Sequence, residues 1–254
     1  TNYRGYDVWE IPPNSSGILA LMMLNIMEGY DFAAMGHNSS EALHIITEAK
    51  KLAFADRDTY VADADANPLP TRELISEAYA AKRRALIDRS RASEAVSAGN
   101  PYENSETVYL VVVDKDRNAV SLIESIFGSF GSKVVPADLG FALQNRGSGF
   151  SLEEGHLNSL EPHKRSLHTN MPGFVMKDGK PLIAFGVMGG SMQPQGHVQV
   201  LSNLFDFGMN MQEAGDAARI RHGGSVLVEP GVSDEVITEL ERLGHTVERA
   251  DGRS

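Results

Sequence analysis

Residues 103–114 read Glu103-Asn104-Ser105-Glu106-Thr107-Val108-Tyr109-Leu110-Val111-Val112-Val113-Asp114, a polar approach that runs into a β-rich segment headed by a hydroxyl residue. A second β-rich run, from Ala119 to Ser125, follows after four polar residues. Valine, isoleucine, tyrosine and leucine favour strands, and aspartate and asparagine favour turns, so the two runs predict a β-hairpin. Thr107 is then either an ordinary strand residue or a reacting group, and the rest of the sequence bears on that choice.

The composition excludes several classes of protein. A chain of 254 residues can bury a sizeable core, as one large domain or two modest ones. Its net charge of −11 argues against a nucleic-acid partner, since affinity for phosphates rests on lysine and arginine. The absence of cysteine excludes disulfides, thiolate zinc sites, iron–sulfur clusters and cysteine nucleophiles. No apolar run approaches the roughly 20 residues that span a bilayer, so no membrane partner is expected.

Both ends of the chain read as cuts in a longer protein. Residues 1–6 carry no initiator methionine and no signal-like segment, and residues 250–254 stop as abruptly. We therefore expect this chain to be an internal piece. We expect a cytoplasmic location, while a periplasmic or secreted one stays open because the true N-terminus is absent.

A linker-like stretch at residues 99–106 divides a helical part, 1–106, from a strand-rich part, 107–254. The elements expected in the first part are a strand at 6–11, a buried apolar helix at 18–27, a helix that begins at Asn38 with a capping box to Glu41, and a helix from about Arg72 to Glu94. In the second of these helices, Glu48, Lys50 and Lys51 are expected to lie away from the apolar face. The elements expected in the second part are a hairpin at 173–187, helices near 197–205, 211–220 and 233–243, and a strand at 225–229.

A hydroxyl nucleophile needs a base within hydrogen-bond reach. The sequence contains no Gly-x-Ser-x-Gly elbow, so a hydrolase triad lacks its local signature. The alternative is a threonine whose own α-amino group is the base, which requires cleavage of the preceding peptide bond. That chemistry needs a polar loop, a threonine and then a strand fixed in a sheet, and residues 100–114 have this order.

The hairpin register gives a geometric prediction. With a three-residue loop at 115–117, Ser125 lies directly opposite Thr107, with Cβ atoms about 5 Å apart, and its hydroxyl can orient the nucleophile. A four-residue loop would shift the register and weaken this contact. Gly189 and Gly190 end a second strand and open a helix, where backbone N–H groups suit a developing oxyanion. Taken alone, the two glycines could equally form an ordinary tight turn.

The chain resembles the γ-glutamyltranspeptidase family of N-terminal-nucleophile hydrolases, and most of all its cephalosporin-acylase-like or oxamate-amidohydrolase-like branch. The matching segments are spread over most of the chain: 3–14, 36–39, 48–57, 107–116, 143–147 and 186–194. The resemblance implies an α+β fold, an αββα four-layer sandwich, with self-cleavage between Glu106 and Thr107 and an acyl-enzyme on the Thr107 hydroxyl. Ser125 falls where the family has a threonine that supports the nucleophile, and Gly189 and Gly190 fall on its oxyanion-hole glycines.

The same resemblance implies a subunit organisation. Residues 1–106 correspond to the C-terminal part of the large subunit, and residues 107–254 to the small subunit without its final strands. The two would form a heterodimer, which could pair into a heterotetramer. No metal or organic cofactor is implied, because nucleophile, base and oxyanion donors all come from the protein.

The departures from the family concern the substrate. Where transpeptidases hold an α-amino group with amide and carboxylate side chains, this chain has Phe127, Arg146 and Gly149, and a cation there would repel an ammonium group. Where the family has a serine pair for the α-carboxylate, this chain has His168 and Thr169, which can still donate hydrogen bonds. We therefore expect Arg146, helped by His168 and Thr169, to bind a carboxylate on the acyl side, the alternative for Arg146 being a structural ion pair.

Three functions are compatible with these residues. The first is an amidohydrolase that acts on a small acidic amide, such as oxamate or a glutaryl- or cephalosporin-like side chain, with water or an amine as acyl acceptor. The second is a γ-glutamyltransferase and glutathione hydrolase with the same machinery. The third is an unprocessed, non-catalytic homologue that acts as a binding protein.

Overall fold

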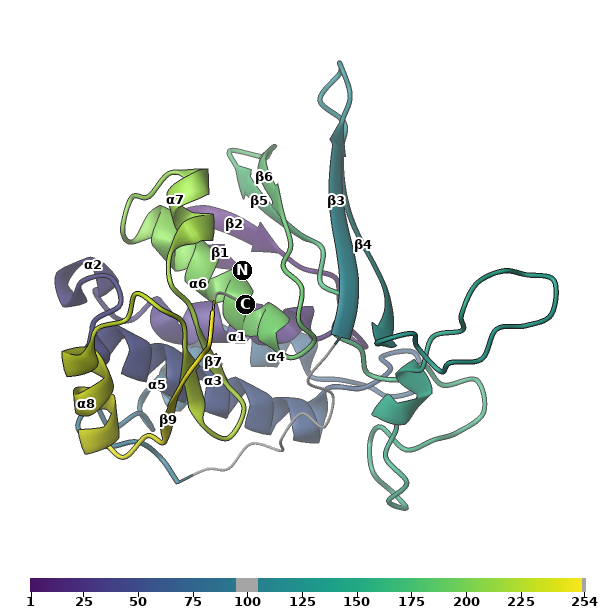
Figure 1. The fold of residues 1–254 in the computed structure, drawn as a ribbon, viewed down its shortest axis with the longest axis horizontal. Coiled ribbons are helices and arrows are strands. Elements are labelled where there is room, and N and C mark those ends of the chain that lie inside the picture. The colour runs from purple at the N-terminus through teal and green to yellow at the C-terminus, as the bar shows by residue number, and fades with distance from the viewer. Residues whose placement is uncertain (95–104, 253–254) are drawn as a thin grey trace.

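The computed structural model describes residues 1–94 and 105–252 (Figure 1). Its largest sheet has four antiparallel strands in the order β1 (Asn2–Tyr3), β2 (Tyr6–Trp9), β5 (Gly173–Lys177) and β6 (Lys180–Phe185). The predicted second hairpin is confirmed as β5 and β6, with Asp178 and Gly179 at positive φ in its tight turn. Because β2 pairs with β5, this sheet joins the chain before Thr107 to the chain after it.

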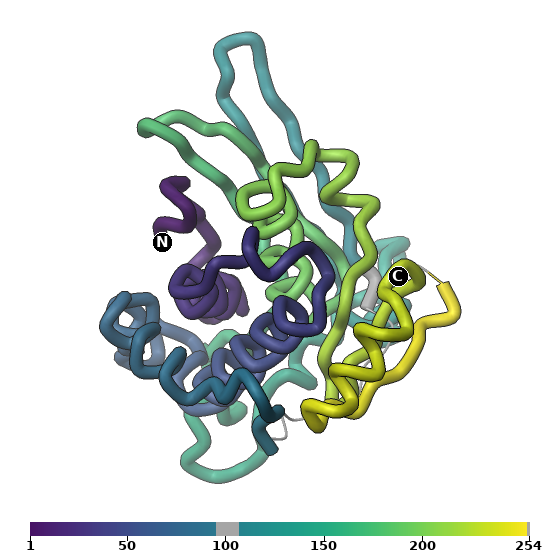
Figure 2. Tube along the Cα trace, turned by 90° about the vertical axis from the view of Figure 1, so that its left-hand side faces the viewer, coloured from purple at the N-terminus to yellow at the C-terminus, as the bar shows by residue number. Residues whose placement is uncertain are grey.

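The helix α1 (Gly17–Met27) anchors the core, and all of its residues are buried. It packs against α3 (Ser40–Tyr60), α5 (Glu77–Arg84) and α6 (Met192–Phe205). Figure 2 looks nearly along α1 and shows α3 and α6 on different sides of it. A helix covered on several sides needs an apolar surface nearly all round, as its sequence predicts.

The predicted first hairpin is confirmed as β3 (Ser105–Val113) and β4 (Ala119–Gly128), which form a separate two-stranded ribbon. Its far end projects from the body of the molecule (Figure 1), and Val112, Val113 and Val120 are more than half exposed there. The ribbon is anchored to the larger sheet, because the Ser121 hydroxyl donates to the Gly173 carbonyl over 3.2 Å.

A third sheet consists of β7 (Ile220–His222), β8 (Val226–Val228) and β9 (Val247–Arg249). The strands β7 and β8 are antiparallel, whereas β8 and β9 are parallel and are connected through α8 (Asp234–Arg242). The shorter helices are α2 (Phe32–Met35), α4 (Thr71–Leu74), α7 (Met211–Asp216) and the 3₁₀ helix η1 (Arg146–Gly149). The α+β class is therefore confirmed.

Several predicted boundaries are wrong. The helix expected from Arg72 to Glu94 is two short helices, because the Ser76 side chain caps a new helix by accepting from the Tyr79 N–H. The helix expected at 211–220 ends at Asp216, and Ile220 begins a strand.

The capping box from Asn38 to Glu41 is also wrong. Ser39 is the N-cap of α3 and accepts from the Ala42 N–H, while Asn38 has φ +51 and donates from its side chain to the Ala218 carbonyl. Of the predicted linker, residues 99–104 lie outside the described part of the chain. In the two described ranges, no helix has the length and apolarity needed to cross a membrane.

Candidate active site

Thr107 lies directly opposite Ser125 in the β3–β4 ribbon, as the three-residue loop predicts. The Asp114 N–H donates to the Asn118 carbonyl over 3.0 Å and sets this register. A β-bulge between Glu106 and Thr107 then shifts the pairing at the peptide bond that the sequence predicts is cleaved. Thr107 is 8 % exposed, so the predicted nucleophile is a buried residue at an irregularity of its strand.

The strand partner Ser125 leads directly to the predicted substrate residues. The Ser125 Oγ accepts from the Phe127 N–H over 2.9 Å, and Phe127 has a φ of +75°, which is uncommon for an aromatic residue. This backbone conformation turns the end of β4, and the Arg146 guanidinium lies over the Phe127 ring at 5.2 Å from its centroid. Thr107 thus pairs with Ser125, Ser125 bonds Phe127, and the Phe127 ring contacts Arg146.

The Arg146 side chain is half-buried on η1. Its Nη2 donates to Asn170 Oδ1 over 2.6 Å, and burial lowers its pKa. Arg146 forms no ion pair with any carboxylate in residues 1–94 or 107–252. Within this part of the chain, Arg146 therefore has no carboxylate with which to form the structural ion pair considered as its alternative role.

His168 lies next to Arg146 in the same network, because its Nδ1 accepts from the Asn170 N–H over 3.2 Å. Its backbone is held by α1, whose N-cap Ser16 donates to the His168 carbonyl from its N–H and its hydroxyl. Burial, with Arg146 and Arg165 in addition, lowers the pKa of His168 from 6.5 to about 4. The imidazole is therefore neutral at pH 7. The neighbouring Thr169 is half-buried.

Gly189 and Gly190 form a turn between β6 and α6, with φ values of +107° and +57° that favour glycine. Their carbonyls accept from the N–H groups of Met192 and Gln193, each over 3.0 Å. Their own N–H groups donate to no other group in the described ranges. The turn follows a segment that lies against β3, because a Cβ on Gly186 would fall 2.5 Å from the Tyr109 ring. The two glycines thus present donors without a partner in the described ranges, and they follow by three and four residues a glycine that contacts the ribbon carrying Thr107.

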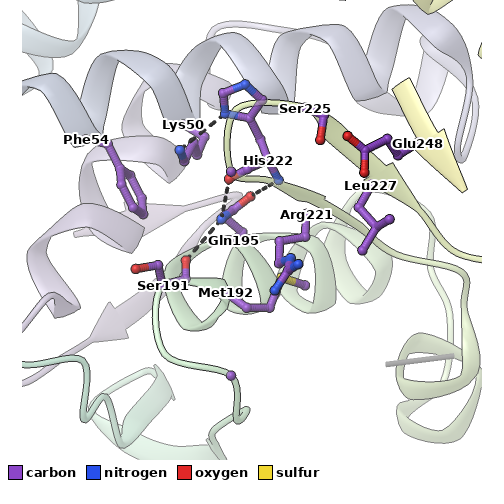
Figure 3. Close-up of a pocket in the computed structure, with 12 residues that line it drawn as sticks. Lys50, Phe54, Ser191, Met192, Gln195, Arg221, His222, Ser225, Leu227 and Glu248 are labelled. Carbon is purple, nitrogen blue, oxygen red and sulfur yellow. Dashed lines mark hydrogen bonds between the residues drawn. The ribbon is translucent and has the colours of Figure 1, made fainter. Parts of the chain in front are cut away.

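Sequence reasoning missed a cavity of about 240 Å³ beside this turn (Figure 3). Gly189, Lys50 and Arg221 are among its lining residues. The Gln195 amide bridges its wall by donating to the Ser191 and His222 carbonyls and accepting from the His222 N–H. No Arg-rich or Lys-rich motif in the sequence marks this cavity, because the side chains that line it come from separate elements of the fold.

The lysine in this cavity belongs to the polar residues of α3 that the sequence places away from its apolar face. Lys50, Lys51 and Glu48 are nevertheless buried, which the amphipathic pattern does not show. The Lys50 ammonium lies 3.2 Å from His222 Nδ1, and burial, with Arg57 in addition, lowers its pKa to about 7. Burial and the neighbouring Lys50 lower the pKa of His222 to about 3. At neutral pH the cavity therefore holds a lysine that is only partly protonated.

The His44, Glu48 and His245 side chains are a group that could ligate a metal, since their ligand atoms lie within 4.8 Å of one another. All three already have partners. His44 Nδ1 lies 2.7 Å from His245 Nε2, and Glu48 accepts from Lys51 and from the Ser93 N–H. The arrangement is that of a satisfied polar network in the interior.

Comparisons with known proteins agree with this geometry. The family model of gamma-glutamyltranspeptidase matches residues 1–254. The chain is 41 % identical to the glutathione hydrolase-like YwrD proenzyme of Bacillus subtilis, covering 98 % of this chain and 48 % of the relative. It is 36 % identical to the acylase ACY 1 proenzyme of Pseudomonas sp. strain V22, covering 98 % and 45 %. The chain spans slightly less than half the length of these relatives.

A solved structure gives the same result for the fold. The crystal structure of cephalosporin acylase from Bacillus halodurans superposes with a TM-score of 0.87 at 43 % identity, covering 98 % of this chain and 45 % of that one. The fold is thus the α+β fold of the N-terminal-nucleophile hydrolases, of which this chain contributes the three sheets described above. A match over the full chain, relatives above 30 % identity and a shared fold agree, and the chain belongs to the γ-glutamyltranspeptidase family.

Proposed function

We propose that the protein containing this chain is an autoprocessing N-terminal-threonine amidohydrolase that cleaves an amide bond of a small carboxylate-bearing substrate. The observation that carries the proposal is the buried Thr107 opposite Ser125, at the β-bulge that follows Glu106. Cleavage between Glu106 and Thr107 frees an α-amino group on the residue that bears the hydroxyl. Nucleophile and base then belong to one residue.

The reaction proceeds in two halves. The Thr107 Oγ1 attacks the amide carbonyl while the Thr107 α-amino group takes its proton and passes it to the leaving amine. The N–H groups of Gly189 and Gly190 donate to the oxyanion of the tetrahedral intermediate. Water or an amine then attacks the resulting ester, the α-amino group takes its proton, and this proton returns to Thr107 Oγ1 as the product leaves. The Ser125 hydroxyl orients Oγ1 in both halves.

Arg146 gives the proposal its substrate class. A half-buried guanidinium without a carboxylate partner among the described residues is suited to a substrate carboxylate, which it can bind with two parallel hydrogen bonds. His168 is neutral at pH 7 and can donate to the same group, and Thr169 supplies a hydroxyl. The cation disfavours an α-ammonium group at this position, so we place an acidic amide ahead of a γ-glutamyl substrate.

The second candidate is a γ-glutamyltransferase and glutathione hydrolase. It is favoured by the 41 % identity to a relative described as glutathione hydrolase-like. In both cases the cleaved pieces stay together as a heterodimer, since β2 of one piece pairs with β5 of the other, and two heterodimers would make the heterotetramer.

The mass of the full-length protein tests the proposal. We expect two fragments divided before Thr107, and a single uncut chain for Thr107→Ala. Thr59→Ala is the matched control, because Thr59 is exposed on α3 and, among the described residues, its hydroxyl bonds only the carbonyl one turn before it. An uncut wild-type chain without hydrolytic activity would instead support a non-catalytic binding protein.

Substrate assays then separate the two enzyme functions. The purified, processed protein is assayed with oxamate, with a glutaryl amide and with a γ-glutamyl anilide. We expect higher kcat/KM for the acidic amides. Higher kcat/KM for the γ-glutamyl anilide, with transfer to added amines, would replace the first function by the second.

A further inference from the structure

Three buried polar side chains gather where α6 begins. They are Glu10, which follows β2, and Gln193 and His197 of α6, and we refer to them as the internal polar cluster. His197 Nδ1 lies 2.6 Å from Glu10 Oε1, and the exposed fractions of these two side chains are 0 % and 1 %. Gln193 is also fully enclosed and lies one turn before His197, so both project from the same side of the helix.

Four polar atoms of the cluster have no hydrogen-bond partner within the described ranges. They are Glu10 Oε2, His197 Nε2 and both amide atoms of Gln193. Leaving such an atom unsatisfied costs about 1–3 kcal/mol, and buried polar atoms in proteins nearly always have a partner. Since these atoms are already enclosed, no further segment of chain can reach them. A water molecule is small enough to do so and can bridge two to four polar groups.

The cluster connects the two parts of the proposed active site. On one side, the backbone N–H of Gln193 donates to the Gly190 carbonyl over 3.0 Å. On the other side, Glu10 follows Trp9, which pairs with Phe174, and the neighbouring Gly173 carbonyl accepts from the Ser121 hydroxyl, which lies 2.8 Å from the Tyr109 hydroxyl. Burial raises the pKa of Tyr109, the Ser121 hydrogen bond opposes this rise, and the Glu10 carboxylate adds to it. Tyr109 follows Thr107 by two residues and faces the same side of β3. Glu10 thus lies between the strand of the nucleophile and the helix of the oxyanion turn.

The surroundings keep the cluster in place. The Phe185 ring contacts the His197 ring edge-on at 4.7 Å between centroids. A Cβ on Gly17 would fall 2.8 Å from the Glu10 Cβ, so α1 also closes over this carboxylate. A rigid enclosure of this kind is what a site needs if its geometry is to fix a neighbouring group.

We infer that Glu10, Gln193 and His197 bind internal water and act as positioning residues that hold the Gly189–Gly190 turn toward β3. This inference rests on the proposed function, because the turn matters only if it receives an oxyanion. The cluster does not touch the substrate. It fixes the direction of two N–H groups whose hydrogen bonds are strongest in the transition state, and its loss should therefore act on kcat.

The kinetic test compares Glu10→Gln, Gln193→Met and His197→Gln in the full-length, processed protein, with active sites counted by a covalent acylating label. Removing an oxyanion-hole donor outright costs about 100- to 1,000-fold in kcat, so a misdirected turn should cost about 10- to 100-fold. We expect KM to stay within about twofold, because ground-state binding is unchanged. Glu235→Gln and Gln212→Met are the matched controls, since both residues are exposed on other helices.

The double variant Glu10→Gln/Gln193→Met separates positioning from general destabilisation. If Glu10 and Gln193 act as one unit, either substitution alone removes the effect of that unit. The kcat of the double variant should therefore equal the kcat of the less active single variant. Full kcat per active site, with only less folded protein, would overturn the inference. Additive losses, or a rise in KM at constant kcat, would overturn it as well.

A crystal structure of the full-length wild-type protein gives a test that does not depend on activity. We expect density for internal water within about 2.7–3.2 Å of Glu10 Oε2 and, on the opposite edge of the imidazole ring, of His197 Nε2. Direct pairing of these side chains without water would overturn the inference. An active Thr107→Ala would overturn the proposed function instead, whereas an inactive Thr107→Ala beside a fully active Glu10→Gln would overturn only the role of the cluster.

Discussion

The Asp63 carboxylate accepts three hydrogen bonds from a single residue, Arg165. Oδ1 accepts from the Arg165 Nε and Nη2 over 3.1 and 2.7 Å, and Oδ2 accepts from its backbone N–H over 2.8 Å. Asp63 follows α3 and is 1 % exposed, while Arg165 comes three residues before His168. The pair therefore ties the loop of a proposed substrate residue to the helical part of the chain.

Replacing Asp63 by asparagine should loosen this loop. The amide keeps the shape but turns one acceptor into a donor that faces the Arg165 N–H groups, and we expect a loss of about 1–3 kcal/mol in the free energy of unfolding. Asp65→Asn is the control, because Asp65 also contacts Arg165 but is exposed, and it should change little. Urea unfolding of the full-length protein at pH 7 measures both. Equal effects of the two variants would contradict this role of Asp63.

The same carboxylate should contribute to acid sensitivity. The hydrogen bonds from Arg165 lower the pKa of Asp63 from 3.8 to about 2, against the opposing effect of burial. A lowered carboxyl pKa stabilises the fold above the ordinary value, and this contribution is lost as the pH falls from about 4 toward 2. We expect the stability of Asp63→Asn to fall less steeply than wild type in this window. Unfolding curves at pH 2.5, 3, 4 and 5 would check this, and parallel curves would contradict it.

Replacing Arg146 by methionine should weaken the binding of acidic substrates. Loss of a charged hydrogen-bonding partner costs about 1.5–3 kcal/mol, which corresponds to a KM increase of roughly 10- to 150-fold for carboxylate-bearing amides. Amides without the carboxylate should be unaffected, and Arg146→Lys should lie between because lysine keeps the charge without the fork. Steady-state kinetics across such a substrate series measure the effect. An unchanged KM throughout would remove Arg146 from the binding site.

The pKa of His168 should rise in the same Arg146→Met variant. In the wild type, burial is the larger cause of its lowered value of about 4, and the Arg146 cation adds to it. Removing the cation leaves the burial effect, so the pKa should move part of the way toward 6.5. An NMR titration of His168 in the wild type and in the variant measures this. An identical titration in both proteins would show that the two side chains are not coupled.

Ser125→Ala should lower kcat by about 10-fold and leave KM nearly unchanged, because a group that orients the nucleophile acts mainly after the substrate has bound. Ser125→Thr should keep most of the activity, since it retains the hydroxyl opposite Thr107. The measurement is kcat per active site in the processed protein. Loss of self-cleavage in Ser125→Ala with full activity of the remaining processed fraction would assign Ser125 to processing alone.

The sequence was sufficient to predict the features that depend on local pattern. The three-residue loop fixed the pairing of Thr107 with Ser125, because an antiparallel register follows from the turn. The Gly189–Gly190 turn was also predictable from local sequence, because two glycines between a strand and a helix indicate a tight turn. In contrast, Ser39 rather than Asn38 caps α3, since both residues can cap and tertiary contact with Ala218 occupies the other.

Features that depend on distant contacts were out of reach. Lys50 and Glu48 belong to a helix that packs against α1, α8 and β7, so its polar side is covered as well, which an amphipathic pattern does not show. The Glu10–His197 pair joins residues 187 positions apart. The family resemblance located the candidate nucleophile and glycines, but no sequence pattern placed a buried carboxylate between their two elements.

The pairing of β2 with β5 has a consequence for the order of events in the life of this protein. A break before Thr107 would leave two pieces that share the β1-β2-β5-β6 sheet and the core, so it would be a nick in a folded domain and not a separation of two domains. Within residues 1–94 and 105–252 the two pieces share one hydrophobic interior, since α1 belongs to one and α6 to the other. If the proposed cleavage takes place, it should therefore follow folding, and separately expressed halves would have to find each other by fragment complementation. The covalent continuity of the chain would then act as a folding aid that the cleaved protein no longer needs.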